Sequence, residues 1–231
     1  MTLLAVDCAT NACSAALWLD DGAGPHRYRS LRRGHAEILM PMVRAVMDEA
    51  ALVFSDLDAI AVTTGPGAFT GIRIGLAAAR GFALAADLPL IGVTTLEAVA
   101  AANDSRGAHL LVALDSKRDD VYVQIFGPDG AQLMAPAAAL PEAAAQLVPE
   151  GPELALAGDA ADRVAAALVR REPAPRRLTG PDLPDAAVVA QLAARRFAAS
   201  PPGAGEAPPL ALYLRPPDAV PAADGGAAPG R

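Results

Sequence analysis

The sequence predicts an α/β protein whose sheets are mixed and whose strands alternate with helices. Apolar runs of strand length at 2–6, 14–19 and 26–31 predict an opening meander of three strands. Apolar residues at helical spacing follow in 35–51, and an alanine-rich helical pattern fills 70–86. These observations favour a sheet that is covered by helices.

The remaining elements continue the same alternation. Strands are expected at 57–64, 90–93, 109–114, 121–126 and 154–157, and helices at 96–102, 141–147, 159–171 and 184–199. Asp21 to Gly24 reads as a turn, and a polar break near residue 104 predicts two halves, 1–104 and a smaller 105–214. Residues 215–231 are dominated by Pro, Gly, Ala and Asp, which predicts a disordered tail.

Composition restricts the classes of function. The net charge is −7 and the pI about 4.9, so the chain by itself is not expected to hold RNA or DNA. The apolar region 74–95 is interrupted by Arg80 and Asp87, which argues against a membrane span, and the N-terminus lacks a basic leader. Cys8 and Cys13 are expected to be buried free thiols in a cytoplasmic protein.

The stretch DCATNACS places Asp7 at the tip of the first predicted strand. In actin-like ATPases a hairpin of this kind holds a metal-bound phosphate, with a glycine beside the Asp so that backbone N–H groups can approach. Cys8 and Ala9 stand there in this chain, and their β-carbons would crowd that approach. We expect a vestigial nucleotide-binding loop formed by Asp7, Thr10, Gly65 and Gly67.

The stretch GPGAFTGIRIG at 65–75 resembles a phosphate-binding loop only in its order of strand, glycine loop and helix. It lacks the Lys-Ser/Thr ending of a P-loop, and no acidic residue ends the next strand as a dinucleotide fingerprint requires. Gly71, Gly75, Ala78 and Ala79 recur at intervals of three or four. Their spacing predicts a helix that another helix approaches closely.

Two further polar groups are weaker candidates. His35 and Glu37 could serve as acid and base or as metal ligands, but Glu37 also fits the first turn of a helix. The charged run 115–120 is expected to be a solvated hairpin turn between strands.

Six stretches in the same order resemble the TsaB (YeaZ) family along most of residues 2–215. They are DCATNACSAALW, RRGHAEILMPMV, LDAIAVTTGPGAFTGIRIGLAAARGFALA, LIGVTTLEAVA, ALDSKRDDVYVQIF and PLALYLR. The resemblance implies the actin-like ATPase fold of sugar kinases and Hsp70, with two RNase H-like halves, mixed sheets flanked by helices, and a reduced second half. It also implies a role in making threonylcarbamoyladenosine on tRNAs that read codons beginning with A.

The same resemblance implies the partners. A TsaB-like chain binds the TsaD transferase directly, works with the ATPase TsaE, and meets tRNA only through the complex. TsaD-like proteins carry a metal-binding His-x-x-x-His, whereas Thr95 and Val99 occupy the matching positions here. We therefore expect a non-catalytic subunit without a metal or cofactor of its own.

The helices at 35–51 and 70–86 are expected to form the partner interface, either with TsaD or with a second copy in a homodimer. The residues predicted to take part are His35, Ile38, Leu39, Met42, Val43, Val46, Thr70, Gly71, Ile74, Gly75, Ala78, Ala79 and Phe82.

Two alternatives remain open from the residues. One is a small actin-fold phosphotransferase that transfers phosphate from ATP and uses Asp7 to anchor a metal ion. The other is a metallopeptidase, against which the missing His-x-x-x-His argues. The sequence also leaves open whether the isolated chain is a monomer or a homodimer, and whether a nucleotide binds at the partner interface.

Overall fold

The computed structural model describes residues 1–20, 22–201 and 207–215, so the predicted tail at 215–231 lies outside the described residues except for Arg215. The first lobe contains β1 (Leu3–Asp7), β2 (Ala12–Leu19), β3 (Gly22–Ser30), α1 (His35–Glu49), a 3-10 turn (Phe54–Asp56), β4 (Ala59–Thr63), α2 (Phe69–Ala86) and β5 (Leu90–Val93). The second contains β6 (His109–Asp115), β7 (Val121–Phe126), β8 (Ala137–Ala139), α4 (Pro141–Gln146), β9 (Leu154–Ala157), α5 (Ala161–Ala167) and β10 (Arg176–Arg177). Helix α3 (Thr95–Ala101) joins the lobes, and α6 (Ala186–Ala199) follows them.

The two lobes repeat one topology. Each runs β-β-β-α-β-α-β, and the sheet orders are β3-β2-β1-β4-β5 and β8-β7-β6-β9-β10. In both, the first strand pairs antiparallel with the second and parallel with the fourth. The expected α/β fold with two mixed sheets flanked by helices is confirmed, and the second lobe has the shorter helices.

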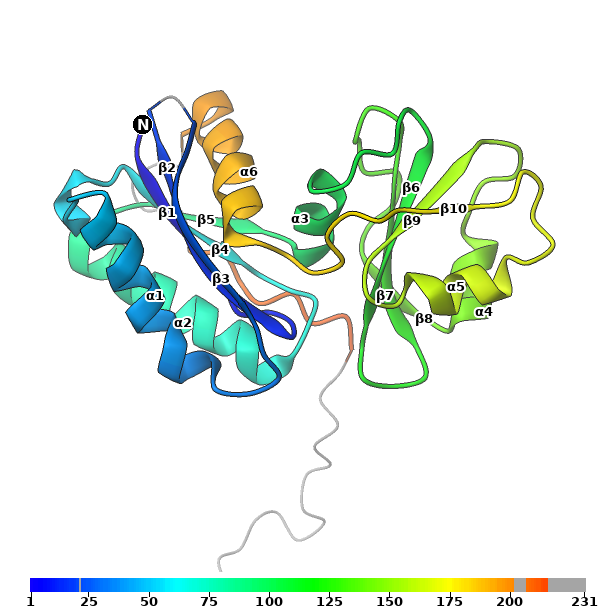
Figure 1. Cartoon of the computed structure of the whole chain (residues 1–231), viewed down its shortest axis with the longest axis horizontal. Coiled ribbons are helices and arrows are strands. Elements are labelled where there is room, and N and C mark those ends of the chain that lie inside the picture. Colours follow the sequence, from blue (N-terminus) through cyan, green and yellow to red (C-terminus); the bar gives the residue numbers. More distant parts are fainter. Residues whose placement is uncertain (21, 202–206, 216–231) are drawn as a thin grey trace, which may run out of the picture.

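Helices cover both faces of the first sheet. Helices α1 and α2 lie on one face and α6 on the other (Figure 1). Apolar side chains alternate along β1, so that Leu4 and Val6 face α1 and α2 while Leu3 and Ala5 face α6. Burial on both faces explains why this strand reads as a continuous apolar run.

The second sheet is covered less evenly. Its core against α4 and α5 is built from side chains such as Leu111, Val123 and Leu156. The opposite face packs on Leu96 and Val99 of helix α3. This helix lies between the lobes (Figure 1). The helices of this lobe are rich in alanine and supply little apolar area. Apolar side chains from the short loops therefore form part of the core.

The division into domains at 1–104 and 105–214 stays a prediction. In the structure, two segments from the C-terminal part of the chain pack against the first sheet. Helix α6 packs on β1 and β2. The segment Ala207–Arg215, which we call the C-terminal strap, follows it: the Leu212 N–H donates to the Thr64 carbonyl at 2.8 Å. Arg80 donates to the Pro209 carbonyl at 2.9 Å. These contacts join residues far apart in sequence, which no local pattern reports.

Among the described residues, polar contacts of Glu97 and of Arg215 join the lobes. Glu97 of α3 accepts from Arg196 of α6 at 2.5 Å and from Gln132 of the second lobe at 2.6 Å. On another side of the molecule, Arg215 of the C-terminal strap forms an ion pair with Asp120. The relative position of the lobes therefore depends on side chains from α3, α6 and the strap.

Four sequence expectations need correction. Within the predicted turn at 21–24, Gly22 and Ala23 are already strand, because they pair with Leu19 and Trp18, while Asp21 lies outside the described residues. Strands β8 and β10 were not predicted, since three alanines and two arginines carry no strand pattern. Helix α5 ends at Ala167 rather than continuing to 171, because the apolar pattern outlasts the hydrogen-bonded helix.

Substitution of Gly158 would test how closely the backbone of the second lobe approaches its central strand, β6. Gly158 and Gly107 both have positive φ, at 100° and 79°, but a Cβ on Gly158 would collide with the Ala113 carbonyl whereas Gly107 faces open space. Gly158→Ala should lower the free energy of unfolding by about 2–4 kcal/mol and Gly107→Ala by about 1 kcal/mol in urea denaturation. Equal losses would show that backbone conformation, not the close approach, is the constraint.

Candidate functional site

Three loops meet at the end of the first lobe where β1 and β4 finish. The Ala68 N–H, just before α2, donates to the Ala9 carbonyl at 2.7 Å. The Leu31 N–H donates to the Asn11 carbonyl at 3.0 Å, and His35 Nε2 lies 2.9 Å from the Thr10 carbonyl. The loop 8–11 therefore contacts both segments that lead into α1 and α2.

The glycines at the start of α2 face this loop. A Cβ on Gly67 would collide with the Ala9 carbonyl oxygen, and one on Gly71 with that of Cys8. Two carbonyl oxygens thus lie where a phosphate would approach the helix N-terminus, and one N–H group there is already occupied. The sequence anticipated crowding by the β-carbons of Cys8 and Ala9, but their carbonyl groups make the contact.

Asp7 lies at the end of β1 and is fully buried. Its Oδ1 accepts from the Thr63 hydroxyl at 2.6 Å and from the Ala9 N–H at 3.1 Å, while Oδ2 has no partner among the described residues. Burial, with a smaller contribution from the charge of Asp185, raises the pKa of Asp7 to about 7, although the two hydrogen bonds act to lower it. The carboxyl is therefore easily protonated near neutral pH.

The structure brings the four predicted vestigial residues together around this point. Thr10 contributes a buried hydroxyl without a partner among the described residues. Gly65 adopts φ 103°, and a Cβ there would meet Ile72 and the Leu212 carbonyl of the C-terminal strap. Thr63 was missed by the sequence analysis, although two threonines directly before a glycine loop could have indicated polar contacts.

The predicted interface residues divide by exposure. Thr70 is exposed, and Ile38, Met42, Ile74, Ala78 and Phe82 are half-buried. The buried members are His35, Leu39, Val43, Val46, Gly71, Gly75 and Ala79. The expected close approach of another helix to Gly71 and Gly75 is wrong, because a Cβ on Gly75 would meet Val62 and Cys8 of the same chain. These glycines fit α2 onto its own sheet.

An exposed aromatic cluster beside the glycine loop was missed. Phe69 begins α2 and is 51% exposed, and the ring of Tyr213 in the strap lies 5.5 Å from it with 46% exposure. The Arg73 guanidinium lies 3.7 Å from the centre of the Phe69 ring, and its Nε donates to the Tyr213 hydroxyl at 3.1 Å. Only the tertiary fold brings Tyr213 to this helix.

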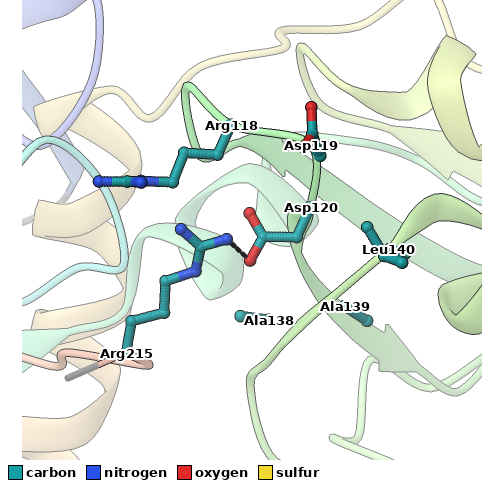
Figure 2. Close-up of a pocket in the computed structure, with 7 residues that line it drawn as sticks. All are labelled: Arg118, Asp119, Asp120, Ala138, Ala139, Leu140 and Arg215. Atoms are coloured by element: carbon teal, nitrogen blue, oxygen red, sulfur yellow. Dashed lines mark ion pairs between the residues drawn. The ribbon is translucent and has the colours of Figure 1, made fainter. Parts of the chain in front are cut away.

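The 115–120 hairpin of the second lobe is more structured than the solvated turn that we expected. Figure 2 shows Arg215 reaching Asp120 at a cavity of about 600 Å³, lined also by Arg118 and residues 138–140. Burial tends to raise the pKa of Asp115, but hydrogen bonds from Lys117 and the charges of Lys117 and Arg163 hold it below its usual value. Asp120 is 8% exposed and pairs with Arg215, so it is part of the contact between the two lobes.

The histidines and cysteines make local contacts. His26 Nε2 lies 2.8 Å from Asp185 Oδ1, and Cys8 and Cys13 are buried free thiols with sulfurs 3.5 Å apart, as expected. Within the described ranges, no group of three or more His, Cys, Asp or Glu side chains is placed to hold a metal ion. Helix α2 has the length and apolarity to cross a membrane, with 28% of that stretch buried.

Comparisons with known proteins agree with this geometry. A family model described as TsaD, tRNA N6-adenosine threonylcarbamoyltransferase, matches residues 29–179. The structure of YeaZ from Pseudomonas aeruginosa is 33% identical with a TM-score of 0.77, over 91% of this chain and 99% of that one. A second Pseudomonas aeruginosa structure, described as similar to peptidase YEAZ, is 34% identical with a TM-score of 0.76, over 93% and 99%.

Among curated proteins, the tRNA threonylcarbamoyladenosine biosynthesis protein TsaB of Escherichia coli is 40% identical over 124 residues, which are 53% of each chain. This chain therefore spans about half the length of the curated TsaB relatives that it matches. An uncharacterized protein of Mycobacterium tuberculosis is 37% identical over 96% of this chain and 95% of that protein.

The duplicated lobes, with an aspartate at the tip of the first strand, define a protein of the actin-like ATPase fold class, to which the sugar kinases and Hsp70 belong. The near-complete match to two solved YeaZ structures is more specific than the fold. The chain belongs to the TsaB (YeaZ) family.

Gly71 and Gly81 form a matched pair for testing the contact at the start of α2. Both lie within this helix, but a Cβ on Gly81 meets nothing within 4 Å. Gly71→Ala should reduce the free energy of unfolding by about 2–4 kcal/mol, because it forces the backbone of loop 8–9 away. Gly81→Ala should raise stability by about 0.5–1 kcal/mol through helix propensity. Urea denaturation followed by circular dichroism would measure both.

Asp7→Asn should change stability in a pH-dependent way. The pKa of about 7 in the folded chain lies above the ordinary value of 3.8 expected in the unfolded chain, so the folded chain holds a proton that the unfolded chain loses. The wild type should lose up to about 1.4 kcal/mol of stability per pH unit from this group as pH rises from 5 to 7. The free energy of unfolding of Asp7→Asn, relative to that of the wild type, should therefore rise as the pH increases over that range.

Exposed Asp48 on α1 provides the control for this experiment. Asp48→Asn should follow the pH dependence of the wild type in urea denaturation. A parallel pH dependence for Asp7→Asn and the wild type would show that Asp7 keeps an ordinary pKa in the folded chain.

Proposed function

We propose that this chain is the non-catalytic scaffold subunit of the system that installs threonylcarbamoyladenosine on tRNAs reading codons that begin with A. In this proposal it binds the TsaD transferase directly and works with the TsaE ATPase in the cytoplasm. The observation that carries the proposal is the occupied glycine loop: the Ala9 and Cys8 carbonyls lie against Gly67 and Gly71. A phosphate at this helix start would meet oxygen lone pairs instead of free N–H groups.

The names of relatives support the biological setting. The TsaB relatives are described as threonylcarbamoyladenosine biosynthesis proteins, and the matching family model as the transferase TsaD. A chain that shares this fold but has Thr95 and Val99 at the positions where TsaD-like proteins carry histidines lacks donors for a metal at that place. A supporting role beside the transferase is consistent with both facts.

The outer surface of α1 and α2 is the proposed docking surface for TsaD. Met40 is 51% exposed on α1, and Thr70 is exposed near the start of α2. The half-buried side chains of the two helices that were predicted to take part are Ile38, Met42, Ile74, Ala78 and Phe82. The buried residues of both helices hold this surface in place by packing on the sheet, which makes it a rigid platform. A homodimer of the isolated chain would use the same surface.

The docking surface can be tested with a bulky charge. Ala78 is half-buried on α2, so Ala78→Arg should place a guanidinium on the surface and weaken binding to TsaD at least tenfold in isothermal titration calorimetry. The control is Ala166→Arg at an exposed position of α5 in the second lobe. This variant should bind TsaD like the wild type.

Equal affinity of the wild type and Ala78→Arg for TsaD, with both chains folded, would show that the interface lies elsewhere on the molecule. Turnover of ATP by the isolated wild type at an ordinary kinase rate would contradict the non-catalytic role.

One observation favours the alternative, a phosphotransferase that takes phosphate from ATP. The Oδ2 atom of Asp7 is buried without a partner among the described residues, as a carboxylate kept for a metal ion would be. In that case Asp7→Asn would abolish ATP turnover while leaving TsaD binding intact. The scaffold proposal instead expects no turnover from either protein.

A further inference from the structure

The charge of this acidic chain is strongly segregated. Residues 22–36 contain four arginines and no acidic residue, so this segment carries +4, and the rest of the chain carries −11 because the total is −7. Within the described ranges, Arg27 pairs with Glu49 of α1, whereas Arg29, Arg32 and Arg33 are exposed and make no ion pair. Unpaired exposed arginines in an acidic protein leave a local positive field.

The fold places the exposed arginines of this segment at one end of the first lobe, where β3 finishes. Strand β3 is an edge strand, and the loop after it leads into α1. Both α1 and α2 begin at this end, because both follow strands that run parallel to β1. The N-termini of two helices of 15 and 18 residues add their positive partial charge to that of the arginines.

The exposed aromatic cluster borders the same end. Loop 8–11 contacts Leu31 through Asn11 and Ala68 through Ala9, and these two loop residues lie at most about 7 Å apart along the chain. Phe69 follows Ala68 directly and carries the Arg73 guanidinium on its ring. Arginines and exposed rings therefore share one surface, which we call the basic end: Arg29, Arg32, Arg33, Phe69, Arg73 and Tyr213.

We propose that the basic end binds the sugar–phosphate backbone of RNA, with Phe69 and Tyr213 as stacking surfaces for unpaired bases. Guanidinium groups recognise phosphate oxygens, and aromatic rings beside them accept bases of any sequence. The acidic groups near this surface are Glu37 in the first turn of α1, Asp120, which is paired with Arg215 of the strap, and Asp7, which is buried beneath it. Residues 163–177 also carry a net charge of +4, but Arg163 and Arg177 there form ion pairs with aspartates. Among the described residues no exposed aromatic cluster lies beside them, so the basic end is the better fit to RNA.

This inference rests on the proposed function in one respect, because the RNA would be the tRNA substrate of the same system. It revises the expectation that tRNA is met only through the complex: the isolated chain would bind weakly, with a Kd of about 10–100 µM at 50 mM salt. In the complex this weak contact would orient the tRNA beside the transferase.

The test is fluorescence anisotropy of the full chain with a fluorescein-labelled tRNA transcript that reads codons beginning with A. Arg32→Glu combined with Arg33→Glu should weaken binding at least tenfold, and Phe69→Ala severalfold. The wild type should show a slope of about −2 to −3 for log K against log salt, as expected for three phosphate contacts. The matched control, Arg170→Glu with Arg195→Glu, removes the same charge from exposed sites elsewhere and should bind like the wild type.

Three results would overturn the inference: no binding of the transcript at 50 mM salt, equal loss in the control, or tighter arginine-dependent binding of a labelled poly-glutamate peptide, which would indicate an acidic protein as the occupant. The assay needs no TsaD, so its outcome is separate from that of the docking experiment. Loss of TsaD binding with unchanged RNA binding in the arginine variant would assign the basic end to the protein interface instead.

Discussion

The contact between loop 8–9 and the first turn of α2 is the constraint on which the first lobe depends. Gly67 and Gly71 have no side chain, so the helix backbone reaches the Ala9 and Cys8 carbonyls. This contact fixes where α2 begins, and the Ala68–Ala9 hydrogen bond ties it to the end of β1. The same contact places Asp7 beneath a closed loop, where burial controls its protonation.

The second lobe repeats this arrangement with different residues. The Ala160 N–H, at the start of α5, donates to the Ala113 carbonyl of β6 at 3.1 Å, and Gly158 provides the close approach. In both lobes a helix start is thus joined by backbone atoms to the central strand or to the loop that directly follows it. The duplication explains how a short second lobe with alanine-rich helices keeps a defined fold: its sheet and this one backbone contact determine the geometry.

The surface of the first lobe divides by chemistry. The outer sides of α1 and α2 mix exposed apolar or small residues, such as Met40 and Ala77, with charged ones such as Arg44, while the end at which both helices begin is basic and aromatic. A protein partner and a polyanion have different requirements, the first for desolvated apolar area and the second for exposed positive charge. One lobe can therefore offer both surfaces without conflict, and the C-terminal strap contributes Tyr213 to the second.

The sequence by itself determined the order and type of the main elements, because the continuous apolar run of β1 and the helical spacing of apolar residues in α1 and α2 are local patterns. It also identified the loop residues Asp7, Thr10, Gly65 and Gly67, which the fold brings together. Only the tertiary structure decided what Gly71 and Gly75 face, since small residues at helical spacing fit a sheet as well as a helix. It alone brought Tyr213 to Phe69 and α6 to the first sheet, because contacts between distant segments leave no periodic signal in either one.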